Sequence, residues 1–208
     1  MFNNVSHPAI IKLNNDNEPI EVLEVVPPPE LHILLGVTNT LYKGVLADVP
    51  EVDRFLKTIH VEREAMHGGS FTGNSCKTIL RNTKLLEEMA PTNCSKYIKA
   101  LKRFGDVVSS CFGVDLDESF KTNITLFKEA FLETGLNVTP KVHAAFFHVE
   151  EFCSRKRMGL GLWSEQVSES IHYDFLQTWK DFKISDISHK NYGSKLLKAV
   201  IIYNSRHI

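Results

Sequence analysis

PPPELHILLGVTNTLYK, residues 27–43, is the stretch that decides the fold class. Proline cannot donate to a β-ladder, so the three prolines end any preceding strand. The residues after them are apolar at steps of three and four, which places their side chains on one helical face. That face comprises Leu31, Leu34, Leu35, Thr38, Leu41, Tyr42 and Val45. We therefore predict a helix that starts directly after the prolines.

The N-terminal side of this stretch has little regular pattern. Val22–Val26 is a β-branched run, which predicts one short strand. We expect residues 1–19 to form a poorly ordered tail. The opening MFNNVSHPAI has neither the basic nor the apolar region of a signal peptide. No apolar stretch approaches the roughly 18–20 residues that span a bilayer. We therefore expect an intracellular protein without a membrane partner, nuclear if it acts on DNA.

Helical periodicity dominates the C-terminal side. Residues 46–75 predict a shorter helix followed by a flexible, glycine-rich loop that ends at Ser75. Six further apolar stripes follow, with Asp115 or Asp117 and the Thr139-Pro140 pair as helix starts, and Gly113 and Gly135 as helix ends. The stripes are Cys76–Met89, Tyr97–Cys111, Phe120–Phe131, Val142–Cys153 and, after a cap at Ser164, Val167–Trp179, with a last one at Tyr192–Tyr203.

These patterns predict a mainly α fold. We expect one domain over residues 20–208, with about seven to eight helices and at most one or two short N-terminal strands. A chain of 208 residues that is 43% hydrophobic can bury one core of this size. The four cysteines are widely spaced without a C-x-x-C motif, which favours reduced, buried thiols over a zinc site or a disulfide framework.

The segment GLGLWSEQVSESIHYDF, residues 159–175, contains the strongest candidate for a metal-binding group of side chains. On a helix that starts at Ser164, Glu165, Glu169 and His172 fall at i, i+4 and i+7 and share one face. Two carboxylates beside an imidazole could hold a hard divalent cation. The alternative is ordinary, because acidic residues in a first helical turn suit the helix dipole.

Two further places carry candidate groups. Glu30 follows the predicted strand, a usual position for functional carboxylates, although it could equally be an N-terminal helix acid. His143 and His148 are five residues apart, whereas three or four would align two ligands on one helical face. We therefore interpret them as core or capping histidines. The spacing does not indicate a zinc site built from His148, Cys153 and the distant His172.

Basic residues form two small clusters that could touch a DNA backbone, although such clusters are more often solvated faces. They are Arg155, Lys156 and Arg157, and Lys96, Lys99, Lys102 and Arg103. The chain has no overall positive charge that would attract nucleic acid, because its 24 Lys and Arg residues are balanced by 25 Asp and Glu residues. The chain also lacks the G-x-S-x-G motif of a serine nucleophile.

Five stretches together resemble the C-terminal part of transposon-derived proteins, which are similar to DDE/DDD transposases of the ribonuclease H-like class. The stretches are PPPELHILLGVTNTLYK, HGGSFTGNSCKTILRN, VTPKVHAAFFHVEEFC, GLGLWSEQVSESIHYDF and LLKAVIIYNSRHI. The resemblance implies a partial ribonuclease H-like core with a helical insertion. It places Glu30 at the second catalytic carboxylate and Glu165 or Glu169 at the late glutamate, with His172 beside them.

The resemblance also implies an incomplete site. The first strands and the first catalytic aspartate of such enzymes should precede residue 20, where only nineteen residues stand. We therefore expect a transposase-derived fragment with weak binding of Mg²⁺ or Mn²⁺ and no strand transfer from this chain alone. Its partners would be DNA, bound in a salt-sensitive manner, or the missing N-terminal half. The alternative, favoured by the near-neutral charge, is a helical protein-protein interaction module without nucleic-acid function.

Overall fold

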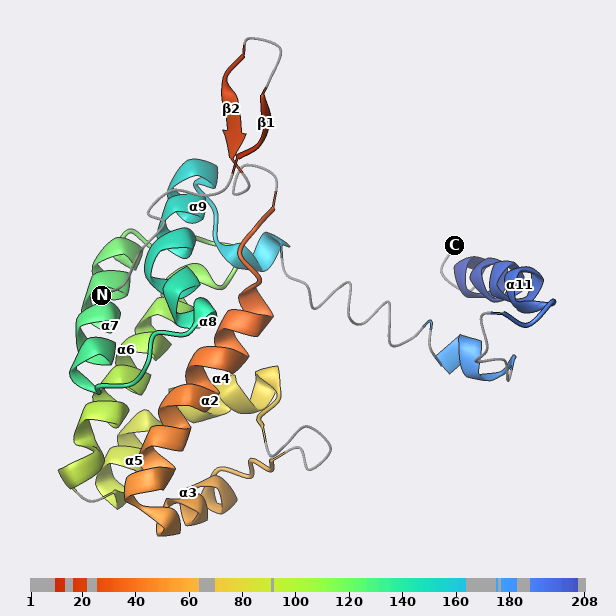
Figure 1. The fold of residues 1–208 in the computed structure, drawn as a ribbon. Coiled ribbons are helices and arrows are strands. Elements are labelled where there is room, and N and C mark those ends of the chain that lie inside the picture. Colours follow the sequence, from red (N-terminus) through yellow and green to blue (C-terminus); the bar gives the residue numbers. More distant parts are fainter. Residues whose placement is uncertain are drawn as a thin grey trace. The chain divides into compact units, whose positions relative to one another are not determined.

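The computed structural model (Figure 1) describes residues 10–13, 17–21, 26–63, 70–90, 92–163, 175, 177–182 and 188–205. Over these residues the protein is mainly helical, as predicted. The chain divides into two compact units, 1–163 and 164–208, where the sequence predicted one domain over 20–208. The core of the first unit is built from buried side chains between Ile33 and Leu160.

The described strands form a small hairpin at the start of the first unit. Strand β1 (Ile10–Leu13) pairs antiparallel with β2 (Pro19–Glu21), so that Ile10 lies opposite Glu21. Part of the predicted tail is therefore a strand. Of the predicted strand Val22–Val26, residues 22–25 lie outside the described residues.

Nine α-helices are described, and α8, a π-helical turn and α9 follow one another without a break. Short 3₁₀ turns connect several of them. The first unit contains α2 (Glu30–Asp48), α3 (Asp53–Thr58), α4 (Gly73–Arg81), α5 (Thr83–Met89), α6 (Ser95–Cys111), α7 (Phe120–Glu133), α8 (Pro140–His143), the π-turn η4 (Ala144–His148) and α9 (Val149–Lys156), and the 3₁₀ turns η1 (Pro50–Val52), η3 (Thr92–Cys94) and η5 (Leu160–Trp163). The second unit contains α11 (Tyr192–Ser205).

Two boundaries differ from the sequence prediction. The glycine-rich loop does not run to Ser75, because α4 already begins at Gly73 and the Thr72 hydroxyl caps it by accepting the backbone N–H of Ser75 at 3.2 Å. The stripe that predicted one helix over Cys76–Met89 is two helices. The chain turns at Asn82, which leaves the helical conformation with φ −107° and ψ 20°.

Two other predicted boundaries are confirmed, and one is shifted. The N-cap of α7 is Ser119 rather than Asp115 or Asp117, and the backbone N–H of Ser119 donates to the Asp117 carboxylate at 2.8 Å. Gly135 adopts φ 75° after that helix, a conformation that glycine reaches without strain. Thr139 caps α8 through the N–H of Val142, with proline at the first helical position.

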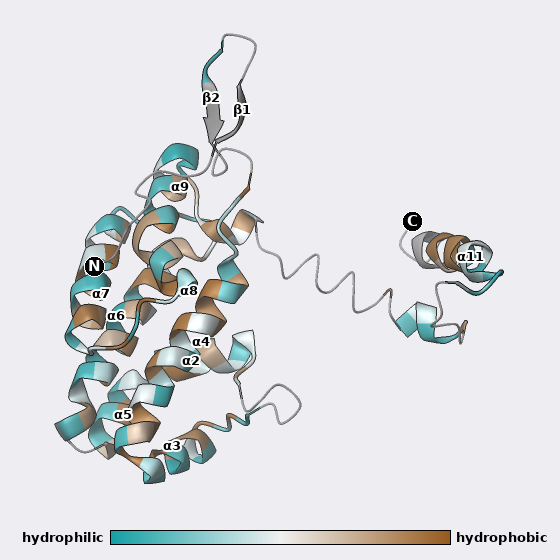
Figure 2. Ribbon diagram, in the orientation of Figure 1, coloured by the Kyte–Doolittle hydropathy of each residue, from teal (hydrophilic) through white to brown (hydrophobic). Residues whose placement is uncertain are grey.

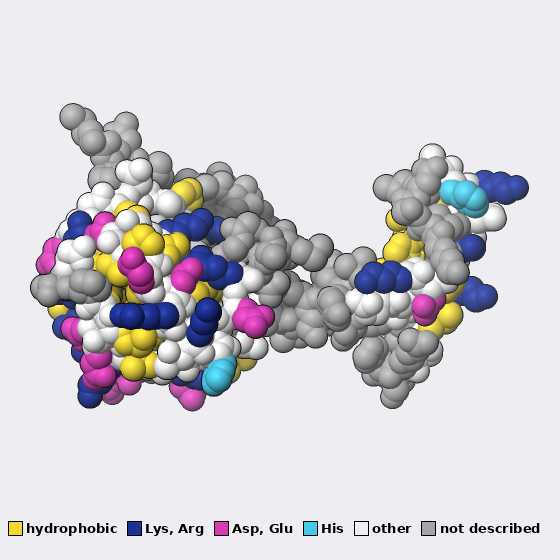
Figure 3. Space-filling model, turned by 90° about the horizontal axis from the view of Figure 1, so that it is seen from below, with side chains coloured by type: hydrophobic (Ala, Val, Ile, Leu, Met, Phe, Trp, Pro, Cys, Tyr) yellow, Lys and Arg dark blue, Asp and Glu magenta, His cyan; other side chains and the backbone are white. Residues whose placement is uncertain are grey.

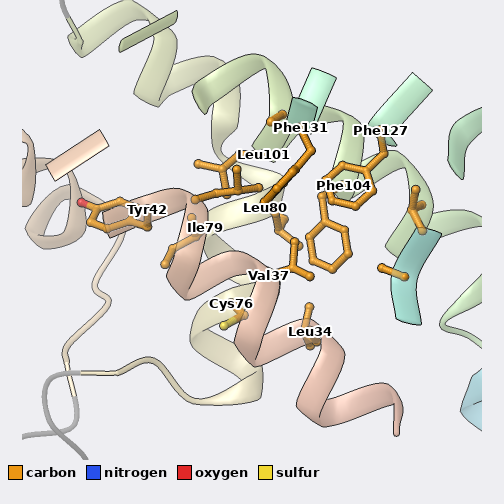
Figure 4. Close-up of a cluster of buried hydrophobic side chains, with 14 of the residues drawn as sticks. Leu34, Val37, Tyr42, Cys76, Ile79, Leu80, Leu101, Phe104, Phe127 and Phe131 are labelled. Atoms are coloured by element: carbon orange, nitrogen blue, oxygen red, sulfur yellow. The ribbon is translucent and has the colours of Figure 1, made fainter. Parts of the chain in front are cut away.

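Aromatic side chains of α6, α7 and the π-turn fill the centre of the first unit. The ring centroid of Phe127 lies 5.0 Å from that of Phe104, 5.9 Å from that of Phe131 and 5.5 Å from that of Phe146. Leu34 and Val37 of α2 and Ile79 and Leu80 of α4 join the same cluster (Figure 4). Hydrophobic and hydrophilic residues alternate along the helices of the first unit (Figure 2), and the buried residues of α2, α6 and α7 are mostly the hydrophobic ones, which is why the periodicity was informative.

In the second unit, α11 packs against the chain around residues 177–182. The ring centroids of Trp179 and Tyr192 are 5.4 Å apart, the Lys195 ammonium donates to the carbonyl of Phe182 at 3.4 Å, and Ala199 is fully buried. Residues 164–174 of the helix predicted after Ser164 lie outside the described part. No described helix has both the length and the apolar character needed to cross a membrane.

Candidate functional site

A groove between α4 and α6 collects basic side chains from both helices. Its volume is about 410 Å³, within the range of ligand sites in proteins. Its walls carry three cations, two hydroxyls, one carboxylate and a hydrophobic floor. The lining residues are Lys77, Leu80, Arg81, Thr83, Lys102, Gly105, Asp106, Val108, Ser109, Phe112 and Gly113.

The helix geometry explains how these groups meet. Lys77 and Arg81 are four residues apart on α4 and therefore lie on one face of it. On α6, Lys102, Gly105 and Ser109 repeat at three and four residues and face the same groove. The helices come close at Gly105, where an added Cβ would lie 3.5 Å from the carbonyl oxygen of Leu80.

The groove holds an excess of positive charge. None of its three cations, Lys77, Arg81 and Lys102, forms an ion pair with another described residue. Its acidic lining residue, Asp106, lies 3.4 Å from the guanidinium of Arg103. An anion that entered the groove would therefore meet cations whose charge is not already neutralised by a described carboxylate. Phosphate is the common biological anion that such lysine and arginine groups bind.

Of the predicted DNA-binding residues, Lys102 lines this groove. Two others form ion pairs: the Lys99 ammonium lies 2.7 Å from Glu133, and the Arg155 guanidinium lies 2.6 Å from Glu151. These pairs are partly exposed and therefore weak, so a phosphate could compete for either cation.

The remaining predicted basic residues lie elsewhere. Arg103 pairs with Asp106, as described above. Lys156 lies over the rings of Phe152 and Trp163, with its nitrogen 5.9 and 6.0 Å from their centroids. Arg157 ends α9 in the left-handed conformation with φ 55°. Figure 3 shows basic and acidic side chains intermixed on one face of the first unit, so charge alone does not single out a surface there.

Of the predicted catalytic residues, the structure describes only Glu30. Glu30 is the first residue of α2 and only 2% exposed, in the position of the N-terminal helix acid that was its alternative interpretation. In this conformation its carboxylate is closed to a hydrated ion or a phosphate from solvent. Glu165, Glu169 and His172 lie outside the described residues.

No group of three or more His, Cys, Asp and Glu side chains in the described part of the chain is arranged to hold a metal ion. The acidic face that predicted Mg²⁺ or Mn²⁺ binding lies outside that part. Metal binding by Glu165 and Glu169 therefore stays a prediction.

The cysteines are free and buried, as predicted. Burial raises the pKa of the Cys76 thiol to about 12, which keeps it protonated at neutral pH. The pKa of Cys111 is also raised, because its thiol shares a hydrogen bond with Cys153 and is buried, while the same hydrogen bond lowers the pKa of Cys153. Burial of this kind is typical of structural thiols rather than nucleophiles.

The sequence prediction missed Lys77 and Arg81. Their signal was present, since they are four residues apart beside the buried positions Cys76 and Ile79, but it indicates a site only once α6 is placed opposite. No protein-family model matches the chain, and neither a curated protein nor a solved structure matches it. The case for the groove accordingly depends on its geometry and charge.

Proposed function

We propose that the first unit binds the phosphate backbone of nucleic acid through the groove between α4 and α6. The observation that carries this proposal is the set of three cations, Lys77, Arg81 and Lys102, that line one groove without an ion pair to a described residue. Lysine, arginine and hydroxyl groups make most protein contacts to nucleic-acid backbones. Ser109 supplies a hydroxyl beside the cations, whereas the buried Thr83 hydroxyl donates to the carbonyl of Leu80.

The overall charge balance sets the expected strength of this binding. A formal net charge of −1 gives no long-range attraction to DNA, so the local cluster must supply the affinity. Such contacts are sensitive to salt and do not depend on base sequence. The resemblance to transposases is consistent with a DNA ligand, and within it the chain would be a fragment that contacts DNA without strand transfer of its own.

The test compares two variants of the full chain that lose equal charge. The groove variant is K77Q/R81Q/K102Q, and the control variant K43Q/K57Q/K121Q removes three exposed lysines from outside the groove. Fluorescence anisotropy with a short labelled DNA duplex at low salt should show binding for wild type and control and a loss for the groove variant. Equal binding by all three proteins, or equal loss in both variants, would reject the groove as the interface.

The metal part of the transposase proposal needs its own experiment. Calorimetric titration of Mn²⁺ into wild type and E165Q/E169Q should show heat of binding that the variant lacks, because a carboxamide is a poor ligand for a hard cation. Identical heats would remove the acidic face from the proposal and leave the nucleic-acid groove untouched.

A second function, the protein-protein interaction module, is favoured by one observation on α11. Leu197, Val200 and Ile201 fall on one helical face and are 62%, 37% and 58% exposed. Exposed apolar residues that cluster in this way often mark interaction sites. Duplex binding that is absent from wild type even at low salt would favour this second function over the first.

A further inference from the structure

The π-helical turn η4 brings together two histidines that the sequence analysis kept apart. His143 and His148 are five positions apart, and at 3.6 residues per turn an α-helix would place them about 140° apart. The structure inserts a wider turn here, in which the N–H of Val149 donates to the carbonyl of Ala144, five residues back. The assumption that a spacing of five residues keeps the two rings apart does not hold here, because it applies to a regular α-helix.

The distance between the two imidazoles suits a shared metal ion. Their ring centroids are 5.1 Å apart, with the ring planes at 70°. A zinc–nitrogen bond of about 2.1 Å puts a ligand's ring centroid about 3.2 Å from the metal, so two tetrahedral ligands have centroids about 5.3 Å apart. The observed spacing is close to this value.

The surroundings leave a ring nitrogen of His148 without a hydrogen-bond partner and restrict the rotation of the His143 ring. The Nδ1 atom of His148 is buried and has no hydrogen-bond partner within the described part of the chain. The ring of His143 packs against Phe147 with centroids 4.9 Å apart, which limits its rotation. The Lys128 ammonium lies 4.2 Å from the centroid of the Phe147 ring.

We propose that His143 and His148 form a two-histidine site for a divalent transition metal ion of the zinc class. Imidazole nitrogen is a preferred ligand of Zn²⁺, and both side chains are partly exposed, so water or a ligand from outside can complete the coordination. A π-turn within a helix is frequently found at functional sites, and here it creates the ligand pair. The site is separate from the nucleic-acid groove and does not depend on it.

The test is a titration of the full chain with Zn²⁺. Wild type should bind one more equivalent than H143Q/H148Q, and each single variant should bind that equivalent at least about tenfold more weakly. The matched control is H32Q, which removes an exposed histidine of α2 and should bind like wild type. Equal stoichiometry and affinity in wild type and the double variant would overturn the proposal.

A second measurement covers the case in which the variants do not fold. Proton–nitrogen NMR spectra of the wild-type imidazoles, recorded during addition of Zn²⁺, should show His143 and His148 shifting together at the same metal concentration. Ni²⁺ should broaden the same two sets of signals. Signals of both rings that stay unchanged while other histidines respond would show that the metal binds elsewhere and would overturn the proposal.

Discussion

Removal of the three groove cations should flatten the salt dependence of DNA binding by a defined amount. Each lysine or arginine that neutralises a backbone phosphate contributes about −0.9 to the slope of log K against log salt concentration for duplex DNA. If Lys77, Arg81 and Lys102 each contact one phosphate, they contribute about −2.7 together. A fourfold rise in salt would then weaken this part of the binding about 40-fold.

The assay is the association constant of a labelled duplex, measured by anisotropy at a series of KCl concentrations between about 50 and 200 mM. The slope for K77Q/R81Q/K102Q should be shallower than that of wild type by about 2.7, and each single substitution should change it by about 0.9. Glutamine keeps a polar but shorter and uncharged side chain, and substitutions at such surface positions usually change stability by less than about 0.5 kcal/mol. Thermal unfolding of each variant checks that the fold is intact.

The control separates local contacts from bulk charge. K43Q/K57Q/K121Q loses the same three positive charges from exposed positions outside the groove, and its slope should equal that of wild type. A groove variant with the wild-type slope would refute the reasoning, since the cations would then release no counterions. A control that flattens the slope as much as the groove variant would refute it too, because overall charge would then explain the effect.

Three predictions concern stability. G105A should stabilise the protein by about 0.5–1 kcal/mol in chemical denaturation, because alanine favours the helix and its Cβ would meet Leu80 only at ordinary contact distance; a loss of stability would show that α4 and α6 pack more tightly than described. T139A should cost about 1 kcal/mol through loss of the cap on α8, and an unchanged midpoint would contradict that role. The hydrogen bonds from Ser119 lower the pKa of the Asp117 carboxyl group. Its charged form therefore stabilises the folded protein at any pH above the unfolded-state pKa of about 3.9. This stabilisation is lost as the pH falls through the lower pKa of the folded state. The melting temperatures of D117N and wild type should therefore differ at neutral pH and converge in acid; a gap that persists in acid would exclude this cause.

The sequence predicted the long helices because their burial follows a simple period. The apolar stripes of α2, α6 and α7 are the faces that the structure buries, and the signals at Gly135 and Thr139 mark real helix boundaries. Local periodicity failed where a single residue changes the path of the chain. The break at Asn82 and the extra residue in the π-turn both leave the apolar pattern looking continuous.

The candidate sites were less predictable, because they depend on partners distant in sequence. The sequence predicted that Lys99 could contact a DNA backbone, but its ammonium group forms an ion pair with Glu133, 34 positions later. Lys77 and Arg81 acquire meaning only when α6 approaches α4 at Gly105. Charge patterns within one helix therefore identified basic faces. Which of these cations form ion pairs depends on tertiary packing, which the pattern of one helix does not contain.

The π-turn also has a consequence for comparing this chain with homologues. A related chain with one residue fewer between His143 and His148 could form a regular α-helix there and still bury side chains equivalent to Val142 and Val149. In such a chain the two histidine positions would be four apart rather than five and would remain stacked along one face. Deletion of one residue should thus preserve the pair, while insertion of one more should separate it, so an alignment gap at this turn carries functional information that residue identity alone would miss.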